Sequence, residues 1–181
     1  MGYTFVLGGA RSGKSTYAEQ LAARMADAHG LPVTYLAAAQ PSDQEMEERI
    51  VRHRQRRPAS WVTVEEPCEI AAWIRTQKDP QIILLDCLSL LLNNWMFLEN
   101  SSEDHILSRI DELVSTLTAC PHTAVVVSNE VGQGIVPTDS FSRHYRDWLG
   151  FMNQAVANKA ETVILTVAGI PVDLRKIQAS L

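Results

Sequence analysis

Eight consecutive residues near the start of the chain have the types and spacing of a triphosphate-binding loop. They read GGARSGKS and match the pattern G-x-x-x-x-G-K-[ST]. In this pattern backbone N–H groups face phosphate oxygens, Lys14 reaches the β- and γ-phosphates, and Ser15 offers a hydroxyl to Mg²⁺. An apolar strand pattern before the loop and a helical pattern after it favour this interpretation over a structural turn. The predicted phosphate-binding residues are Gly8, Gly9, Ala10, Arg11, Ser12, Gly13, Lys14 and Ser15.

An acidic residue, Asp86, ends a second apolar segment, IILLD. In phosphate-loop proteins a carboxylate at the end of such a strand holds Mg²⁺, directly or through water. Asp86 could instead cap the helix predicted to follow it. The phosphate loop favours the metal role, so we predict Ser15 and Asp86 as Mg²⁺ ligands. Another polar strand end, at Ser128, Asn129 and Glu130, belongs to the edge where ligands bind in open α/β sheets.

Residues 49–58 read RIVRHRQRRP and place five arginines around His53. Ser42 and Glu45 form an S-x-x-E capping box and Pro58 closes the far end, which predicts one helix over 42–57. Its acidic first turns and basic last turns complement the helix dipole, and for an isolated helix this structural interpretation is the better one. A phosphate-handling protein also has a use for clustered guanidinium groups, so the segment is a candidate part of a catalytic site.

Short apolar runs alternate with longer helical patterns along the chain. The runs predict strands over 3–7, 33–37, 61–64, 82–86, 124–128 and 162–167, and the longer patterns predict helices over 14–29, 42–57, 67–77, 89–98, 103–117 and 141–159. The strands lack polar alternation, as is typical of strands covered on both faces. This rhythm predicts an α/β fold of the P-loop NTPase (RecA-like) type, with a mainly parallel sheet and helices on both faces.

Composition narrows the classes of protein that the chain can belong to. It has 181 residues, 46% of them hydrophobic, which predicts a single nucleotide-binding domain over 1–181. A formal net charge of -5 argues against general binding to nucleic acid. The three cysteines are far apart, and the N-terminus lacks the charged region of a secretory signal. Polar residues interrupt the most apolar stretch, 82–98, so we expect a cytoplasmic protein without a membrane span.

Five segments together resemble the bifunctional adenosylcobinamide kinase / adenosylcobinamide-phosphate guanylyltransferase family of cobalamin biosynthesis. They are GGARSGKS, DQEMEERIVRHRQRRPASWVTVEEP, LLDCLSLLLNN, NEVGQGIVP and RHYRDWLGFMNQAVA, in this order along nearly the whole chain. The resemblance implies that ATP or GTP phosphorylates the aminopropanol hydroxyl of adenosylcobinamide. It then implies transfer of GMP from GTP onto that phosphate, which gives adenosylcobinamide-GDP. It also implies a homo-oligomer, specifically a trimer.

The resemblance also implies roles for individual residues. The family pattern R-I-x-x-H-x-x-x-R-P falls on residues 49–58, which makes His53 the nucleophile that GMP modifies. The loop from Gly8 to Ser15 then holds the GTP phosphates. Similar proteins often carry a threonine where this chain has Ala38. Further nucleotide contacts are implied for Ala37, Ala38, Ala39, Arg54, Gln55, Arg56, Arg57, Glu65 and Asp86.

The chemistry of an imidazole is consistent with the role that the resemblance gives His53. A neutral imidazole is a competent nucleophile near pH 7, and its attack on the α-phosphorus of GTP gives a phosphoramidate. Arg54 and Arg57 are the arginines best placed to stabilise the charge that develops on the phosphoryl oxygens. Two alternatives stay open. One is a simple P-loop small-molecule kinase in which His53 has no role, and the other is a RecA-like ATPase acting on nucleic acid, which the negative net charge weakens.

Overall fold

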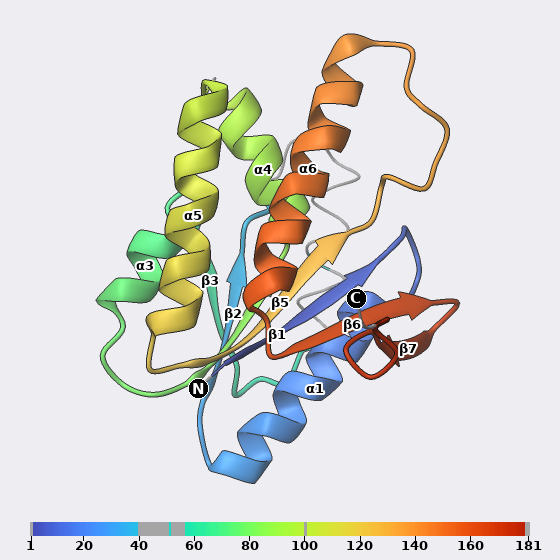
Figure 1. The fold of residues 1–181 in the computed structure, drawn as a ribbon. Helices are drawn as coiled ribbons and strands as arrows, with labels where there is room; N and C mark the ends of the chain where they lie inside the picture. The colour runs from blue at the N-terminus through green and yellow to red at the C-terminus, as the bar shows by residue number, and fades with distance from the viewer. Residues whose placement is uncertain (1, 40–50, 52–56, 100, 180–181) are drawn as a thin grey trace.

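Seven strands form one sheet at the centre of the protein (Figure 1). The structure is a computed structural model that describes residues 2–39, 51, 57–99 and 101–179. Across the sheet the order is β3-β2-β4-β5-β1-β6-β7, and every neighbouring pair is parallel except β6 with β7. The strands are β1 (Tyr3–Gly8), β2 (Val33–Ala37), β3 (Val62–Glu65), β4 (Ile82–Asp86), β5 (Thr123–Asn129), β6 (Thr162–Val167) and β7 (Ile170–Asp173).

Helices cover both faces of the sheet (Figure 1). One face carries α1 (Lys14–His29). The other carries α3 (Ile70–Thr76), α4 (Leu88–Phe97), α5 (Glu103–Ala119) and α6 (Ser140–Lys159). Local sequence sets two of the helix starts, because Ser102 accepts a hydrogen bond from the backbone N–H of His105 and Asp139 accepts one from Ser142.

The strands carry buried apolar side chains on both faces, which explains their continuous hydrophobic runs. On β1, Phe5 belongs to the core under α3 to α6, whereas Val6 belongs to the core under α1. On β2, Leu36 belongs to the core under α3 to α6 and Tyr35 belongs to the core under α1. Full burial of a large apolar side chain contributes about 1.5–3 kcal/mol. The two cores together hold the strand ends in fixed positions.

The carboxyl ends of the parallel strands meet at one edge of the sheet. Gly8 of β1 pairs with Asn129 of β5, and Ala37 of β2 pairs with both Asp86 of β4 and Glu65 of β3. In open parallel sheets this edge is where ligands bind. Because β5 lies between β1 and β4, the phosphate loop and Asp86 share the edge with one strand between them.

The structure confirms the predicted fold class and the six predicted strands, whose ends lie within one residue of the predicted ones. The helix predicted over 42–57 lies outside the described residues, apart from 51 and 57. α3 begins at Ile70 rather than at 67. Glu66 explains this difference, because its Oε1 accepts hydrogen bonds from the backbone N–H groups of Cys68 and Glu69 and holds these residues in a turn.

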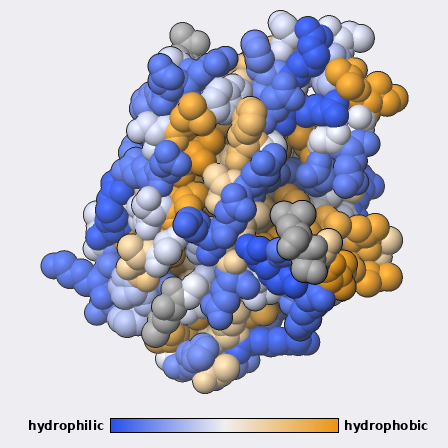
Figure 2. Space-filling model, in the orientation of Figure 1, coloured by the Kyte–Doolittle hydropathy of each residue, from blue (hydrophilic) through white to orange (hydrophobic). Residues whose placement is uncertain are grey.

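β7 was not predicted from the sequence. It follows a tight turn in which Ala168 and Gly169 have φ values of 51° and 82°. The run after this turn contains Pro171, a residue that argues against a strand inside a sheet. β7 tolerates the proline because it lies at the edge of the sheet. Exposed Val167 and Ile170 account for hydrophobic surface over this turn, on the right of Figure 2.

A second exposed hydrophobic region covers the loop between β5 and α6, at the upper right of Figure 2. Ile135 and Val136 of this loop are both exposed. Next to it, the rings of Phe97 and Phe141 join the end of α4 to the start of α6, with 4.3 Å between ring centres. In the part of the chain that the structure describes, no helix has both the length and the hydrophobicity needed to cross a membrane.

Candidate nucleotide-binding site

The predicted phosphate loop is the turn that joins β1 to α1. Within it the backbone N–H of Ser12 donates to Gly9 O at 3.2 Å, and Lys14 Nζ donates to the same oxygen at 3.1 Å. Gly13 precedes the helix with a φ of 94°, a left-handed conformation that glycine adopts without strain. The backbone N–H groups at the start of α1 and its positive dipole end therefore lie at the strand edge, which is suited to an anion.

The β6–β7 turn supports this loop from a distant part of the sequence. Gly169 N donates to Ser12 O at 2.8 Å, and the hydroxyl oxygens of Ser12 and Thr166 are 2.8 Å apart in a hydrogen bond. A Cβ atom at Gly8 would overlap both hydroxyl oxygens and would lie 2.8 Å from Thr166 O. Position 8 therefore requires glycine for steric reasons, and the loop is held in place by the turn.

Asp86 is the last residue of β4, and it does not cap α4. The N-cap position belongs to Cys87, whose side chain makes no capping hydrogen bond, so the alternative role for Asp86 is wrong. Asp86 Oδ2 instead accepts a hydrogen bond of 2.7 Å from the hydroxyl of Tyr35. Burial, and then the neighbouring Asp86 carboxylate, raises the pKa of Tyr35 well above its ordinary value of 10.0. The phenol therefore remains a hydrogen-bond donor at neutral pH.

Arg57 lies against the other side of this pair. Its guanidinium carbon is 3.2 Å from the centre of the Tyr35 ring, and its Nη1 donates to Thr63 Oγ1 at 3.3 Å. Thr63 of β3 is the residue that pairs with Tyr35 of β2. Arg57 thus joins the end of the arginine-rich segment to the strand that carries Tyr35. The other site residues predicted in that segment lie outside the described part of the chain: His53, Arg54, Gln55 and Arg56.

The remaining predicted nucleotide contacts end the strands on the β3 side of Asp86. Ala37 is the last residue of β2, Ala38 is fully buried, and Ala39 is partly exposed. Glu65 ends β3 and is exposed. Four strand spacings separate β3 from β1, so Glu65 lies about 19 Å from Gly8 along the edge. The structure therefore brings the phosphate loop close to Asp86 and places Glu65 at the far end of the same edge.

The polar residues at the end of β5 join a hydrogen-bonded network. Ser128 Oγ donates to Asn153 Oδ1 at 2.7 Å, and Asn153 Nδ2 donates to Asn129 O at 3.0 Å. The backbone N–H of Glu130 donates to Gly8 O at 3.1 Å. These bonds tie β5 to α6 on one side and to the phosphate loop on the other. They hold the end of β5 beside Gly8.

The oxygen donors at this edge fit Mg²⁺. Mg²⁺ usually takes one or two protein oxygens and completes its shell with phosphate oxygens and water. The Ser15 hydroxyl and the Asp86 carboxylate are two such groups, and the Tyr35 hydrogen bond uses Oδ2, which leaves Oδ1 for a cation. Among the described residues no group of three or more His, Cys, Asp or Glu could hold a metal. A metal at this edge would thus depend on the nucleotide for part of its coordination.

Three residues that support the site were not predicted: Tyr35, Asn94 and Thr166. Asn94 Nδ2 donates to Ala38 O and to Pro67 O, each at 2.8 Å. The partners of these three residues are 51, 56 and 154 positions away in sequence. Each is a polar or hydroxyl-bearing residue inside an otherwise apolar segment, and in the sequence this pattern is only a weak indication of a supporting role.

One surface hollow borders the site. It has a volume of about 390 Å³ and lies beside the helix that follows the phosphate loop. The lining residues come from α1 and from the stretch before β3, and they include the guanidinium that packs on Tyr35. They are Thr16, Glu19, Gln20, Ala23, Arg57, Pro58 and Trp61.

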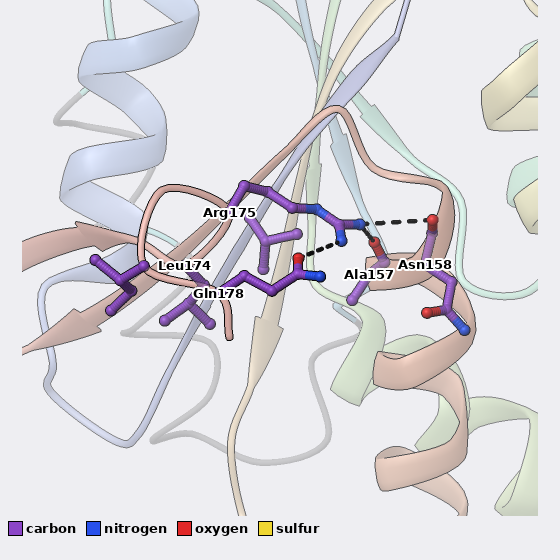
Figure 3. Close-up of a pocket in the computed structure, with 7 residues that line it drawn as sticks. Ala157, Asn158, Leu174, Arg175 and Gln178 are labelled. Atoms are coloured by element: carbon purple, nitrogen blue, oxygen red, sulfur yellow. Dashed lines mark hydrogen bonds between the residues drawn. The ribbon is translucent and has the colours of Figure 1, made fainter. Parts of the chain in front are cut away.

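A second hollow, of about 380 Å³, lies away from the site (Figure 3). Ala157 and Asn158 at the end of α6 line it together with Arg175 and Gln178 from the segment after β7. Arg175 donates to Ala157 O at 2.5 Å and to Gln178 Oε1 at 3.1 Å, so its charge is used to cap α6. Val163 at the start of β6 also lines this hollow. The hollow therefore lies at the edge of the sheet opposite the phosphate loop.

Comparison with solved structures identifies the fold. A solved ATPase domain superposes with a TM-score of 0.53 at 12% sequence identity, over 91% of this chain and 68% of that one. At this level of identity the similarity concerns the fold alone. It agrees with the P-loop NTPase architecture described above.

Comparison with protein sequences identifies the family. The sequence profile described as cobinamide kinase / cobinamide phosphate guanyltransferase matches residues 4–174. The chain is 43% identical over 171 residues to the bifunctional adenosylcobalamin biosynthesis protein CobP of Pseudomonas aeruginosa, covering 94% of this chain and 95% of that protein. It is 37% identical over 182 residues to the bifunctional adenosylcobalamin biosynthesis protein CobU of Escherichia coli K12, covering 94% and 98%. The chain therefore belongs to the cobinamide kinase / cobinamide phosphate guanyltransferase family.

Proposed function

We propose that this protein phosphorylates adenosylcobinamide with ATP or GTP and then transfers GMP from GTP onto the new phosphate. One observation carries the proposal: the phosphate loop and Asp86 share a sheet edge, one strand apart, in a chain that matches this family over residues 4–174. Its substrates are ATP or GTP and a cobinamide. We place both reactions in the cytoplasm.

In the first reaction the aminopropanol hydroxyl attacks the γ-phosphorus of the nucleotide. The bond to the β-phosphate oxygen breaks, the nucleoside diphosphate leaves, and the hydroxyl proton passes to solvent. Residues 8–15 hold the phosphates through backbone N–H groups, and Lys14 neutralises the β- and γ-phosphate oxygens. Ser15 and Asp86 would hold a nucleotide-bound Mg²⁺, which would further stabilise the negative charge on these oxygens.

In the second reaction His53 is the nucleophile. An imidazole nitrogen attacks the α-phosphorus of GTP, a P–N bond forms, and pyrophosphate leaves. A phosphate oxygen of adenosylcobinamide phosphate then attacks the same phosphorus, which breaks the P–N bond and returns the histidine. Arg54 and Arg57 offset the charge that develops on the phosphoryl oxygens. Further nucleotide contacts come from residues 37–39, Gln55, Arg56 and Glu65.

The proposal is tested by the mass of the corrinoid products. Parent protein incubated with adenosylcobinamide, GTP and Mg²⁺ should give the phosphate and then the GDP derivative. His53→Ala should accumulate the phosphate, because the first reaction does not use the imidazole. His144→Ala is the matched control, since His144 is an exposed histidine in a basic part of α6 and should leave both reactions unchanged.

Each other outcome contradicts a different part of the proposal. Phosphate as the final product of the parent would make the protein a simple small-molecule kinase. GDP derivative formed at the parent rate by His53→Ala would exclude the histidine route. We also propose a homo-oligomer, a trimer, on the basis of the family resemblance, and sedimentation equilibrium of the purified protein would measure it directly.

A further inference from the structure

We propose that Tyr35 is a positioning residue that sets the orientation of the Asp86 carboxylate, and that Arg57 holds Tyr35 in place. The inference rests on the proposed function, in which Asp86 is a ligand of the nucleotide-bound Mg²⁺. It adds a link from the arginine-rich segment to the metal site. The four residues Asp86, Tyr35, Arg57 and Thr63 are called the Tyr35 array below.

The first part of the array is the hydrogen bond between Tyr35 and Asp86. Tyr35 is 3% exposed and lies under α1, two residues before the end of β2. Its hydroxyl reaches along the neighbouring strand end and donates to Asp86 Oδ2 at 2.7 Å. A carboxylate at a strand end rotates about its terminal torsion angle, for which the preferences are broad. The phenol restricts this rotation and leaves Oδ1 for a cation.

The second part is the contact between Arg57 and the tyrosine ring. The guanidinium carbon is 3.2 Å from the ring centre, within the range of a cation–π interaction. Thr63 accepts from Arg57 at 3.3 Å and pairs with Tyr35 across β2 and β3, so the guanidinium is held over the ring from the next strand. A cation over the ring draws electron density from the phenol, which makes its hydroxyl a stronger hydrogen-bond donor to the carboxylate. The ring is thus fixed between two charges of opposite sign.

A purely structural role makes a different prediction from a positioning role. If Tyr35 only filled the core under α1, phenylalanine would serve equally well, because it keeps the ring and loses only the hydroxyl. A positioning role predicts that loss of the hydroxyl weakens the metal site while the fold persists. Groups that orient a metal ligand typically affect metal affinity by about 10–100-fold. The array is partly solvent-facing at Arg57, so we expect the lower end of this range for Tyr35→Phe.

Tyr3 provides a matched control. It is also a buried tyrosine, at 1% exposed, and its hydroxyl donates a 2.6 Å hydrogen bond to Val156 O. It begins β1, so its bond lies at the edge opposite Asp86. Tyr3→Phe therefore removes a buried hydroxyl and a hydrogen bond of similar length without touching the Tyr35 array. Any difference in metal affinity between the two variants reports the Asp86 contact.

The measurement is the affinity of the GDP-saturated protein for Mn²⁺, which reports the Mg²⁺ site without turnover. Free Mn²⁺ is followed by electron paramagnetic resonance, and the Mn²⁺ bound by GDP alone is subtracted. We expect about a 10-fold weaker Mn²⁺ affinity for Tyr35→Phe and less than about a 2-fold change for Tyr3→Phe. Arg57→Leu should weaken the affinity about 3-fold, because the ring loses its support but keeps its hydroxyl. Asp86→Asn should have the largest effect.

The combined results distinguish the positioning role of Tyr35 from the metal role of Asp86. If Asp86→Asn weakens Mn²⁺ binding and Tyr35→Phe matches Tyr3→Phe, the positioning role is overturned while the metal role of Asp86 stands. If Asp86→Asn binds Mn²⁺ as the parent does, the metal assignment in the proposed function fails, and the positioning role fails with it. Parent-like affinity in Arg57→Leu would overturn the part of the inference that concerns Arg57.

Discussion

Replacing Gly8 by alanine tests whether the phosphate loop is held by the β6–β7 turn. The new methyl group would overlap the hydroxyl oxygens of Ser12 and Thr166 and would lie 2.8 Å from the Thr166 carbonyl oxygen. Overfilling of a packed site costs about 1–3 kcal/mol. Separation of the buried Ser12–Thr166 hydrogen bond adds about 1 kcal/mol. We therefore expect Gly8→Ala to lower the free energy of unfolding by about 3 kcal/mol.

Thermal unfolding provides the assay for this prediction. For a chain of 181 residues, 1 kcal/mol corresponds to about 2–4 °C in Tm, so Gly8→Ala should melt about 6–12 °C below the parent. Gly9→Ala is the matched control, because a Cβ atom at Gly9 meets no other atom within 4 Å. Its free energy of unfolding should stay within about 0.5 kcal/mol of the parent. Adding Thr166→Ala to Gly8→Ala should restore part of the loss, since it removes one of the two overlapping hydroxyls.

The refuting result is a Gly8→Ala protein that melts within about 2–3 °C of the parent, a range that corresponds to about 1 kcal/mol. It would mean that the turn and the loop separate at little cost. Thr166 at the end of β6 and the β6–β7 turn would then not be supports of the phosphate loop. An equal loss of stability in Gly8→Ala and Gly9→Ala would also refute the steric argument, since the structure gives the two positions different surroundings.

Three further predictions concern charges and a thiol. Lys14→Ala should keep the fold and reduce kcat with GTP in both reactions by about 100-fold or more, as loss of a charge aimed at the phosphates does; near-normal turnover would remove the loop from the mechanism. Arg109→Met should lower the free energy of unfolding, measured with denaturant, by about 2–3 kcal/mol, because Arg109 is buried between Glu69 and Glu99. Arg75 is exposed, so Arg75→Met should lower this free energy by under about 1 kcal/mol, and an equal loss in the two variants would contradict the prediction. Burial raises the pKa of Cys87 to about 11, so at pH 8 iodoacetamide should modify this thiol only in unfolded protein. Rapid modification of Cys87 in the native protein would contradict its burial.

The elements of the fold were largely predictable because their signals are local. Continuous apolar runs predicted the six parallel strands, and the helix over 14–29 has the predicted ends. β7 was missed because Pro171 argues against a strand, and only its edge position makes the proline acceptable. The start of α3 was misplaced because the Glu66 side chain competes for backbone N–H groups that the helical pattern would have used.

The candidate site was predictable where one contiguous pattern determines it. The sequence GGARSGKS specifies the loop, and the position of Asp86 after an apolar run specifies a strand end. The supporting contacts were not predictable, because they depend on which strands are neighbours. Tyr35 meets Asp86 only because β2 pairs with β4, and Thr166 meets Ser12 only because β6 pairs with β1. A sequence of parallel strands does not by itself specify that order.

Labelling with α-phosphate-labelled GTP is the direct test of guanylyl transfer through His53. The protein is incubated with labelled GTP and Mg²⁺ in the absence of corrinoid, denatured and digested. We expect up to one mole of label per mole of chain, on the peptide that contains His53. Acid should release this label and alkali should not, as a phosphoramidate requires. His144→Ala should be labelled normally and His53→Ala should carry no label. Label that persists in His53→Ala would contradict His53 as the nucleophile. An unlabelled parent that still transfers GMP to adenosylcobinamide phosphate would contradict a covalent intermediate.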